Sequence, residues 1–407
     1  MLTVNKSNRY ILKNGSFFPY LADTAWTMLQ LLNREEIIFY LDKRVAQGFN
    51  AVQVSAVSEL GGLTVPNREG YMSFFDADPT KPDDRYFSIV EFLADECEKR
   101  NMVLTLLPTW GDKFNLKWGS GPEVFTPENA YFYGKYLAKV IGKRENIIWM
   151  LGGDRPIETE NHRKIIDEMA RGLREGELVR HLISYHPNGE NSSANFLADA
   201  DYIDFHTIQS SHDFGGYHSE LMVLDTINKT GKPTIDAECF YEDFPIRFQL
   251  DWDYRFNPLD IRRRIYKNML SGTFGHTYGH QSVWCFRNET NEEYLYDWKQ
   301  ALDRPMAQQM QHINKLLKKV DITSYKPSEI AHNALCCEGE GYGLVYAENT
   351  EPVFIDLDER AEFAQMQWFN PATGEFEPKV CVSKAHITTA SPFGHDGLLI
   401  IYFDKEI

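Results

Sequence analysis

The sequence predicts an α/β protein, in which a (β/α)8 TIM barrel is followed by a small C-terminal β-sandwich. Up to about residue 320, short apolar runs rich in Val, Ile and Leu alternate with longer amphipathic stretches, a pattern typical of repeated β-α units. From about residue 322 the pattern changes to short alternating strands separated by glycine-containing turns. With 407 residues, two domains are expected, a barrel over 1–320 and a sandwich over 321–407.

The barrel domain begins with a predicted hairpin, TVNKSNRYILKNGSFF, whose turn is Asn14-Gly15 and which we expect at the barrel floor. Eight apolar segments then fit parallel strands, and no glycine-rich phosphate loop follows the first of them. Eight such units favour a closed barrel over an open doubly wound sheet. The predicted strands are 18–22, 51–55, 103–107, 147–151, 182–185, 202–206, 233–237 and 273–278.

The segments between the strands carry helix signals. Asn33 is expected to cap a helix that ends at Gly48, and Thr126 to cap one with Pro127 in its first position. The other predicted helices are 84–100, 159–175, 218–229, 259–271 and 294–319.

Composition excludes several classes of partner. A net charge of −17 without a basic run disfavours nucleic acid and anionic membrane surfaces, and no apolar run approaches the roughly 20 residues of a membrane span. The six cysteines lack metal-ligand spacing, so free thiols are expected. The first fifteen residues lack a secretory signal, which predicts a cytoplasmic protein, or a periplasmic or secreted one if a signal was removed. The sequence does not predict an oligomeric state.

Two carboxylates stand out, because the working residues of a barrel lie just after its strands. Asp154 follows IIWMLGG and Glu238 follows PTIDA, on strands expected to face each other across the barrel mouth. Glycosidic bond hydrolysis needs such a pair, one group to protonate the leaving oxygen and the other to attack or stabilise the anomeric carbon. The alternative is structural: Asp154 would pair with Arg155, and Glu238 with a basic neighbour such as Arg247.

Aromatic residues make up 14% of the chain, and several follow predicted strands, where sugar rings could stack on them. Asp23 is expected to bind substrate hydroxyls or, alternatively, to cap the turn that bears Trp26. For each histidine the alternative is an internally satisfied polar group, and for each tryptophan it is core packing. The predicted substrate-binding residues are Asp23, Trp26, Gln53, Trp110, His186, His206, Tyr241, His276 and Trp284.

The segments FPYLADTAW, GFNAVQVS, WMLGGDRP, SYHP and KPTIDAE, in this order, resemble glycoside hydrolase family 140, the apiosidase-like group. The resemblance covers nearly the whole chain and implies a (β/α)8 barrel with a C-terminal β-sandwich named for collagen binding, a role that we do not predict. It also implies an Asp acid/base after strand four and a Glu nucleophile after strand seven, which correspond to Asp154 and Glu238. The wider clan usually carries Asn-Glu where this chain has Gly153-Asp154.

The sequence therefore predicts a retaining, exo-acting glycosidase for a glycan side chain of plant type, with an oligosaccharide or polysaccharide-derived glycan as its partner and no metal or organic cofactor. One alternative is a metal-dependent hydrolase, although no H-x-H after the first strand and no H-E-x-x-H helix is present. The other is a non-catalytic carbohydrate-binding protein on the same fold.

Overall fold

A curled sheet of six parallel strands runs through the first domain of the computed structural model, which describes residues 1–213 and 218–403. Its strands are buried throughout, which explains why sequences such as VLTLL of β6 and IIWMLG of β7 are largely apolar rather than alternating. A parallel pair, β10 (His206–Gln209) and β11 (Thr234–Glu238), continues it, with the short β9 (Asn191–Ser192) antiparallel to β10. In spatial order the six strands are β12 (Gly275–Tyr278), β4 (Tyr20–Thr24), β5 (Ala51–Ser55), β6 (Val103–Leu107), β7 (Ile147–Gly152) and β8 (Leu182–His186).

The pair β10–β11 lies between the two ends of the curled sheet. On one side, Ser184 of β8 donates its hydroxyl to the carbonyl of Phe205, just before β10, at 2.8 Å. On the other side, the amide of Glu242 donates to the carbonyl of Gly279, just after β12, at 2.9 Å. These bonds place the pair beside both ends of the curled six-stranded sheet. Strand β10 begins at His206, so the segment 202–206 predicted as a strand is mostly the turn before it.

The helices that follow the strands carry the predicted caps. The Asn33 side chain accepts from the amide of Glu36 and the Glu36 side chain from the amide of Asn33, and Thr126 and Asn129 form the same box. The α-helices of this domain are α1 (Met28–Leu31), α2 (Arg34–Ala46), α3 (Asp84–Lys99), α4 (Pro127–Ile141), α5 (Glu160–Gly176), α6 (Ala194–Leu197), α7 (Ser219–Thr230), α8 (Pro258–Leu270), α9 (Trp298–Ala301) and α10 (Pro305–Leu317). The short 3-10 helices are η1 (Phe75–Ala77), η2 (Gly111–Lys113), η3 (Ile246–Phe248) and, in the C-terminal region, η4 (Asp358–Phe363).

One predicted helix is wrong in its continuity. The segment 294–319 forms two helices, α9 and α10, instead of one. Pro305 opens α10, because a proline has no amide to donate and is tolerated in the first turn but not in a helix interior.

The N-terminal hairpin has the predicted turn. Strands β1 (Leu2–Val4), β2 (Ile11–Lys13) and β3 (Ser16–Phe17) form a small antiparallel sheet. Its side chains Leu2 and Ile11 pack in one cluster with Ala51, Val103 and Ile148, which stand at the starts of barrel strands. The hairpin therefore closes the barrel at the end opposite to the strand termini that bear the candidate site.

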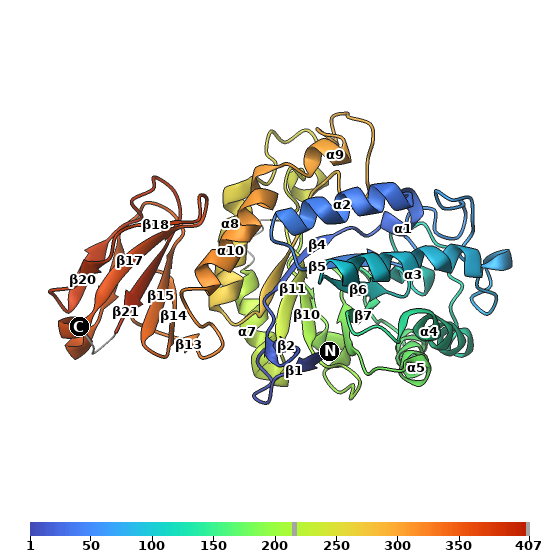
Figure 1. Ribbon diagram of the computed structural model, residues 1–407, viewed down its shortest axis with the longest axis horizontal. Helices are drawn as coiled ribbons and strands as arrows, with labels where there is room; N and C mark the ends of the chain where they lie inside the picture. The colour runs from blue at the N-terminus through green and yellow to red at the C-terminus, as the bar shows by residue number, and fades with distance from the viewer. Residues whose placement is uncertain (214–217, 404–407) are drawn as a thin grey trace.

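The C-terminal region is antiparallel and has its own apolar cluster, which includes Val345, Leu399 and Ile401. Figure 1 shows it on one side of the barrel, beyond α8 and α10. One sheet contains β13 (Lys326–Pro327), β14 (Leu335–Gly339), β15 (Tyr342–Ala347), β21 (Gly397–Tyr402), β17 (Gln365–Asn370), β18 (Glu375–Phe376) and β19 (Val380–Cys381), and a second pairs β16 (Val353–Asp356) with β20 (His386–Thr389).

A buried ion pair joins the two regions. Asp396 is fully buried and accepts from Arg262 Nη2 of α8 at 2.7 Å and from the Tyr346 hydroxyl of β15 at 2.9 Å. Next to it, the rings of Tyr266 and Tyr346 are stacked with their centroids 5.4 Å apart. Within residues 1–213 and 218–403, the helices are all too short or too polar to cross a bilayer.

Candidate active site

A sharp turn after β7 presents Asp154 at the barrel mouth. Gly152, Gly153 and Asp154 have φ values of 84°, 120° and 54°, three successive residues in the left-handed region. A side chain at position 153 would bring its Cβ to 2.8 Å from the amide nitrogen of Gly111, so the turn requires glycine there. The apolar strand thus ends in a backbone shape that turns the following carboxylate out of the barrel wall.

The Asp154 carboxylate is held through one of its oxygens. Its Oδ2 accepts from Trp118 Nε1 at 2.7 Å and from Arg155 Nη1 at 2.9 Å. The side chain is 23% exposed, so it is fixed but remains reachable from solvent. Burial and the negative charge of Glu238 raise the pKa of Asp154, and Trp118 and Arg155 oppose this rise.

Glu238, the last residue of β11, lies deeper, with only 6% of its surface exposed. His212 Nε2 is hydrogen-bonded to its Oε1 at 3.2 Å, and His186 Nε2 lies 3.2 Å from its Oε2. Burial by itself would raise the pKa of Glu238, but the hydrogen bonds and charges of His186 and His212 lower that pKa to about 2.

His186, the last residue of β8, connects the two carboxylates. Its Nδ1 accepts from the backbone amide of Asp154 at 3.2 Å, while its Nε2 faces Glu238. The same Nδ1 also lies 3.0 Å from the carbonyl oxygen of Pro187. The strand ends of β7, β8 and β11 therefore form one polar centre.

Aromatic side chains surround this centre. Trp26 and Trp110 pack against the His186 ring, with centroids 5.2 and 5.8 Å away, and Trp26 Nε1 donates to the Tyr241 hydroxyl at 2.8 Å. Burial and the negative charge of Glu238 both raise the pKa of the Tyr241 hydroxyl. Trp284 is half-buried and packs on the same apolar cluster as Trp26 and Trp110. These predicted residues are brought together at the mouth.

Other predicted residues lie within the barrel wall. Asp23 lies inside β4, fully buried, and accepts from Arg44 Nε at 2.6 Å and from the Tyr40 hydroxyl at 2.5 Å, two groups of α2. Gln53 is also fully buried and donates to the carbonyl of Ala237 at 2.8 Å.

Two predicted histidines are fully buried and serve internal contacts. His206 Nδ1 is hydrogen-bonded to the Ser193 hydroxyl at 2.8 Å, and His276 Nε2 lies 3.2 Å from Cys239 Sγ. Burial lowers the pKa of each imidazole to about 3, so both rings are neutral at physiological pH.

Among the contacts of the carboxylates, the one with Trp118 was not predicted, whereas the pairing of Asp154 with Arg155, the structural alternative for Asp154, is present at 2.9 Å. Trp118, His212 and Arg155 touch the carboxylate pair, and Arg155 Nη2 donates to Glu59 Oε1 at 2.8 Å. The segment LKWGSGPE, with a tryptophan beside a glycine in a long connection, was the available signal for Trp118. In the described part of the chain, no three or more His, Cys, Asp or Glu side chains are grouped so that they could hold a metal ion.

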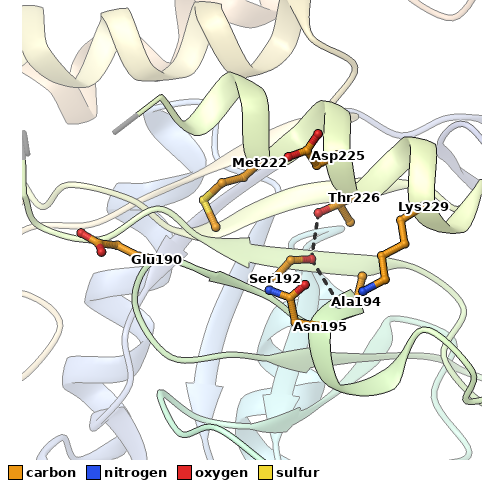
Figure 2. A pocket seen from close by; sticks show the side chains of 8 residues that line it. All are labelled: Glu190, Ser192, Ala194, Asn195, Met222, Asp225, Thr226 and Lys229. Carbon is orange, nitrogen blue, oxygen red and sulfur yellow. Dashed lines mark hydrogen bonds between the residues drawn. The ribbon is translucent and has the colours of Figure 1, made fainter. Parts of the chain in front are cut away.

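A cavity of about 140 Å³ lies elsewhere, between β9 and α7. Figure 2 shows Ser192 at its centre, hydrogen-bonded to Thr226, with the charged ends of Glu190, Asp225 and Lys229 around it. Its lining contains none of the residues predicted for the site, and neither Asp154 nor Glu238 reaches it.

Residues 5–324 match the family described as "Apiosidase-like, catalytic domain". No curated protein matches the chain by sequence. Among solved structures, a glycoside hydrolase family 5 protein from Bacteroides vulgatus is 27% identical over 98% of this chain and 93% of its own, with a TM-score of 0.88.

Two further structures are alike in fold alone. One, described as a glycoside hydrolase, is 23% identical with a TM-score of 0.87 and covers 100% of this chain and 97% of its own. The endo-β-1,4-mannanase of Thermotoga petrophila is 12% identical with a TM-score of 0.53, over 90% and 92%.

Proposed function

Because the chain belongs to the apiosidase-like family of glycoside hydrolases, and is thus a glycosidase, we propose that it acts as a retaining, exo-acting enzyme with Glu238 as nucleophile and Asp154 as acid/base. Its substrate is then a terminal sugar, apiose by the family's description, on a glycan side chain of plant type.

The opposite pKa shifts of the two carboxylates carry this proposal. Glu238, with a pKa of about 2, is ionised at every pH at which the fold is expected to work, as a nucleophile must be. Asp154, with its pKa raised by burial and by the charge of Glu238, is the one that can hold a proton. Two carboxyl groups whose environments separate their pKa values are typical of an acid and nucleophile pair.

The reaction follows from these states. Glu238 attacks the anomeric carbon while Asp154 donates its proton to the leaving oxygen, so the glycosidic C–O bond breaks and a glycosyl ester forms on Glu238. Esterification removes the charge that raised the pKa of Asp154, so that pKa falls and the carboxylate becomes a suitable base. Asp154 then takes a proton from water, the water oxygen bonds to the anomeric carbon, and the sugar is released with Glu238 free again.

The proposal also includes a closed eight-stranded barrel as the frame of the site. It is supported by the amide of Gln281, which donates to the carbonyl of Glu242 at 3.0 Å, and by the reciprocal bond from Glu242 to Gly279. These contacts join the ends of β11 and β12 beside Glu238.

Substitution of each carboxylate tests the assignment. We expect Glu238→Gln to reduce turnover of apiosides to background, and Asp154→Asn to lower kcat by roughly 10²- to 10⁴-fold on a substrate whose leaving group needs protonation. In 4-nitrophenyl apioside the leaving group, 4-nitrophenolate, departs without a proton. The Asp154→Asn protein should therefore form the glycosyl enzyme readily but hydrolyse it slowly, which gives a burst of nitrophenol. Azide should rescue this variant and yield a glycosyl azide.

The stereochemistry provides a second readout. The first product detected by proton NMR should keep the anomeric configuration of the substrate, and the opposite anomer would contradict retention. Near-normal turnover by Glu238→Gln protein, with an unchanged melting temperature, would overturn the assignment of the nucleophile.

A further inference from the structure

An exposed tryptophan lies directly against the proposed acid. Trp118 is 57% exposed, although its indole Nε1 donates to Asp154 Oδ2 at 2.7 Å. The guanidinium carbon of the buried Arg155 lies 4.8 Å from the centroid of the indole ring and supports it. More than half of a large aromatic side chain is therefore open to solvent at the barrel mouth, in a fixed orientation.

The loop that carries Trp118 is built to keep this position. The fully buried Asp112 accepts through Oδ2 from the amide of Gly121 at 2.7 Å, from the amide of Ser120 at 3.1 Å and from Lys113 Nζ at 2.7 Å. A Cβ at Gly119 would overlap the side chains of Asp112 and Arg155, so the chain can pass between them only as glycine. An aromatic surface held in this way loses little conformational entropy when a ligand binds to it.

The contacts of Asp154 indicate which of its two carboxyl oxygens carries the proton in the acid form. Both Trp118 and Arg155 donate to Oδ2, and the described residues offer no hydrogen bond to Oδ1. When the acid is protonated, Oδ2 keeps accepting from the two N–H groups, which leaves the proton on Oδ1. The leaving oxygen must therefore approach Oδ1 of the same carboxyl group whose Oδ2 the exposed indole contacts.

We propose that Trp118 forms the leaving-group subsite of this enzyme, in which the apolar C–H face of the leaving sugar stacks on the exposed indole. This inference rests on the proposed function, because it takes Asp154 as the acid. Such a subsite favours a glycoside of a sugar over a glycoside of a small alcohol, because only the sugar has a ring face to stack.

Three apiosides that differ only in the leaving group test the subsite: an apiosyl disaccharide, methyl apioside and apiosyl fluoride. Fluoride leaves without taking up a proton, and it has no ring that could stack on the indole. We expect Trp118→Ala to lower kcat/KM about tenfold or more on the disaccharide, with little change on the fluoride. Trp118→Phe keeps a ring without the N–H group, so it should restore part of the loss on the disaccharide only.

Phe132→Ala is the matched control, since Phe132 is an aromatic residue of α4 with 47% of its surface exposed and lies outside the proposed machinery. It should leave kcat/KM unchanged on all three compounds. Equal losses on the disaccharide and on methyl apioside in Trp118→Ala, with the fluoride spared, would mean that the indole acts only through Asp154, and would overturn the subsite.

Binding separates this inference from the proposed function. Calorimetric titration of the Glu238→Gln protein with the disaccharide should show binding that the added Trp118→Ala substitution weakens. This result would support the subsite even if the wild-type protein hydrolyses no apioside. Hydrolysis of the disaccharide that is indifferent to Trp118 would overturn the subsite and leave the proposed function standing.

Discussion

A carboxylate buried as deeply as Glu238 stays ionised only where neighbouring groups replace its lost hydration. His212 does so from the loop after β10, 3.2 Å from Oε1. Its ring is in turn stacked on Phe244, with centroids 4.3 Å apart and planes 13° from parallel, which fixes the direction of Nε2. The charge of the proposed nucleophile thus depends on an aromatic contact one step away.

Substitution of His212 should move the acidic limb of the pH profile. In His212→Phe, the pKa of Glu238 rises because a group that lowers it is removed, so kcat/KM on methyl apioside should begin to fall at a higher pH than in the wild type. His212→Gln restores a donor without a charge and should shift the limb less. A limb that does not move would show that His212 leaves the ionisation of Glu238 unaffected.

His386 provides the control for this series, since it lies in β20 of the C-terminal sheet with its side chain 83% exposed. His386→Gln should leave the profile unchanged.

The candidate pair was predictable because both residues directly follow strongly apolar strands, and such positions converge in a barrel. Their catalytic roles remain predictions. Trp118 was not predictable, because a long connection has no periodicity that shows where its side chains lie. Arg155 was, since its pairing with the adjacent Asp154 was the structural alternative. Asp23 shows the uncertainty of strand ends: β4 extends to Thr24, so a residue expected after the strand is part of it and its side chain is buried against α2.

At the scale of elements, the side chain of Glu242 connects the end of β11 with β12 and α10 through hydrogen bonds. It follows β11, its Oε2 accepts from the Tyr278 hydroxyl of β12 at 2.7 Å, and its Oε1 accepts from the amide of Met306 in the first turn of α10 at 3.2 Å. Burial, together with the charge of Asp243, raises the pKa of Glu242 to about 7.

This raised pKa has a defined effect on stability. A carboxyl group whose pKa is higher in the folded state contributes stability that is fully present below its unfolded pKa, near 4.3, and is lost as the pH rises through about 7. Gln mimics the protonated form and does not titrate. We therefore expect the free energy of unfolding of Glu242→Gln to exceed that of the wild type by a margin that grows between pH 5 and pH 8.5, up to about 3 kcal/mol.

Urea unfolding at pH 5, 7 and 8.5 measures this margin. Glu351→Gln, at an exposed position of the C-terminal region, is the control and should run parallel to the wild type. A margin that stays constant over this range would contradict the proposed titration.

At the scale of the whole molecule, the barrel and the C-terminal sheet share the buried pair Arg262–Asp396. Asp396→Ala leaves the guanidinium buried without its carboxylate, and such losses cost about 3 to 5 kcal/mol. We expect the melting temperature of Asp396→Ala to fall clearly, and that of Asp396→Asn to fall less. Asp76→Asn, which removes an exposed partner of Lys81, should change it little. Equal effects of Asp396→Ala and Asp76→Asn would contradict a structural role for the buried pair.

The succession of parallel strands and helices followed from periodicity, since apolar segments and capped helices were visible in the chain. The contact between the two regions was not, because Arg262 and Asp396 are far apart in sequence and neither has a neighbour that marks it as buried. The break before α10 was marked by Pro305, and the prediction of one helix did not take it into account.

The order in which the strands are synthesised has a further consequence. In the sheet, Tyr20 of β4 pairs with Gly275 of β12, about 250 residues later in the chain. At translation rates of about 5 to 20 residues per second, β4 emerges roughly 12 to 50 seconds before that neighbour exists. For this time one edge of an apolar strand lacks its partner on the ribosome. Nascent chains stalled between α8 and β12 should therefore bind chaperones, and chains released beyond α10 should do so much less.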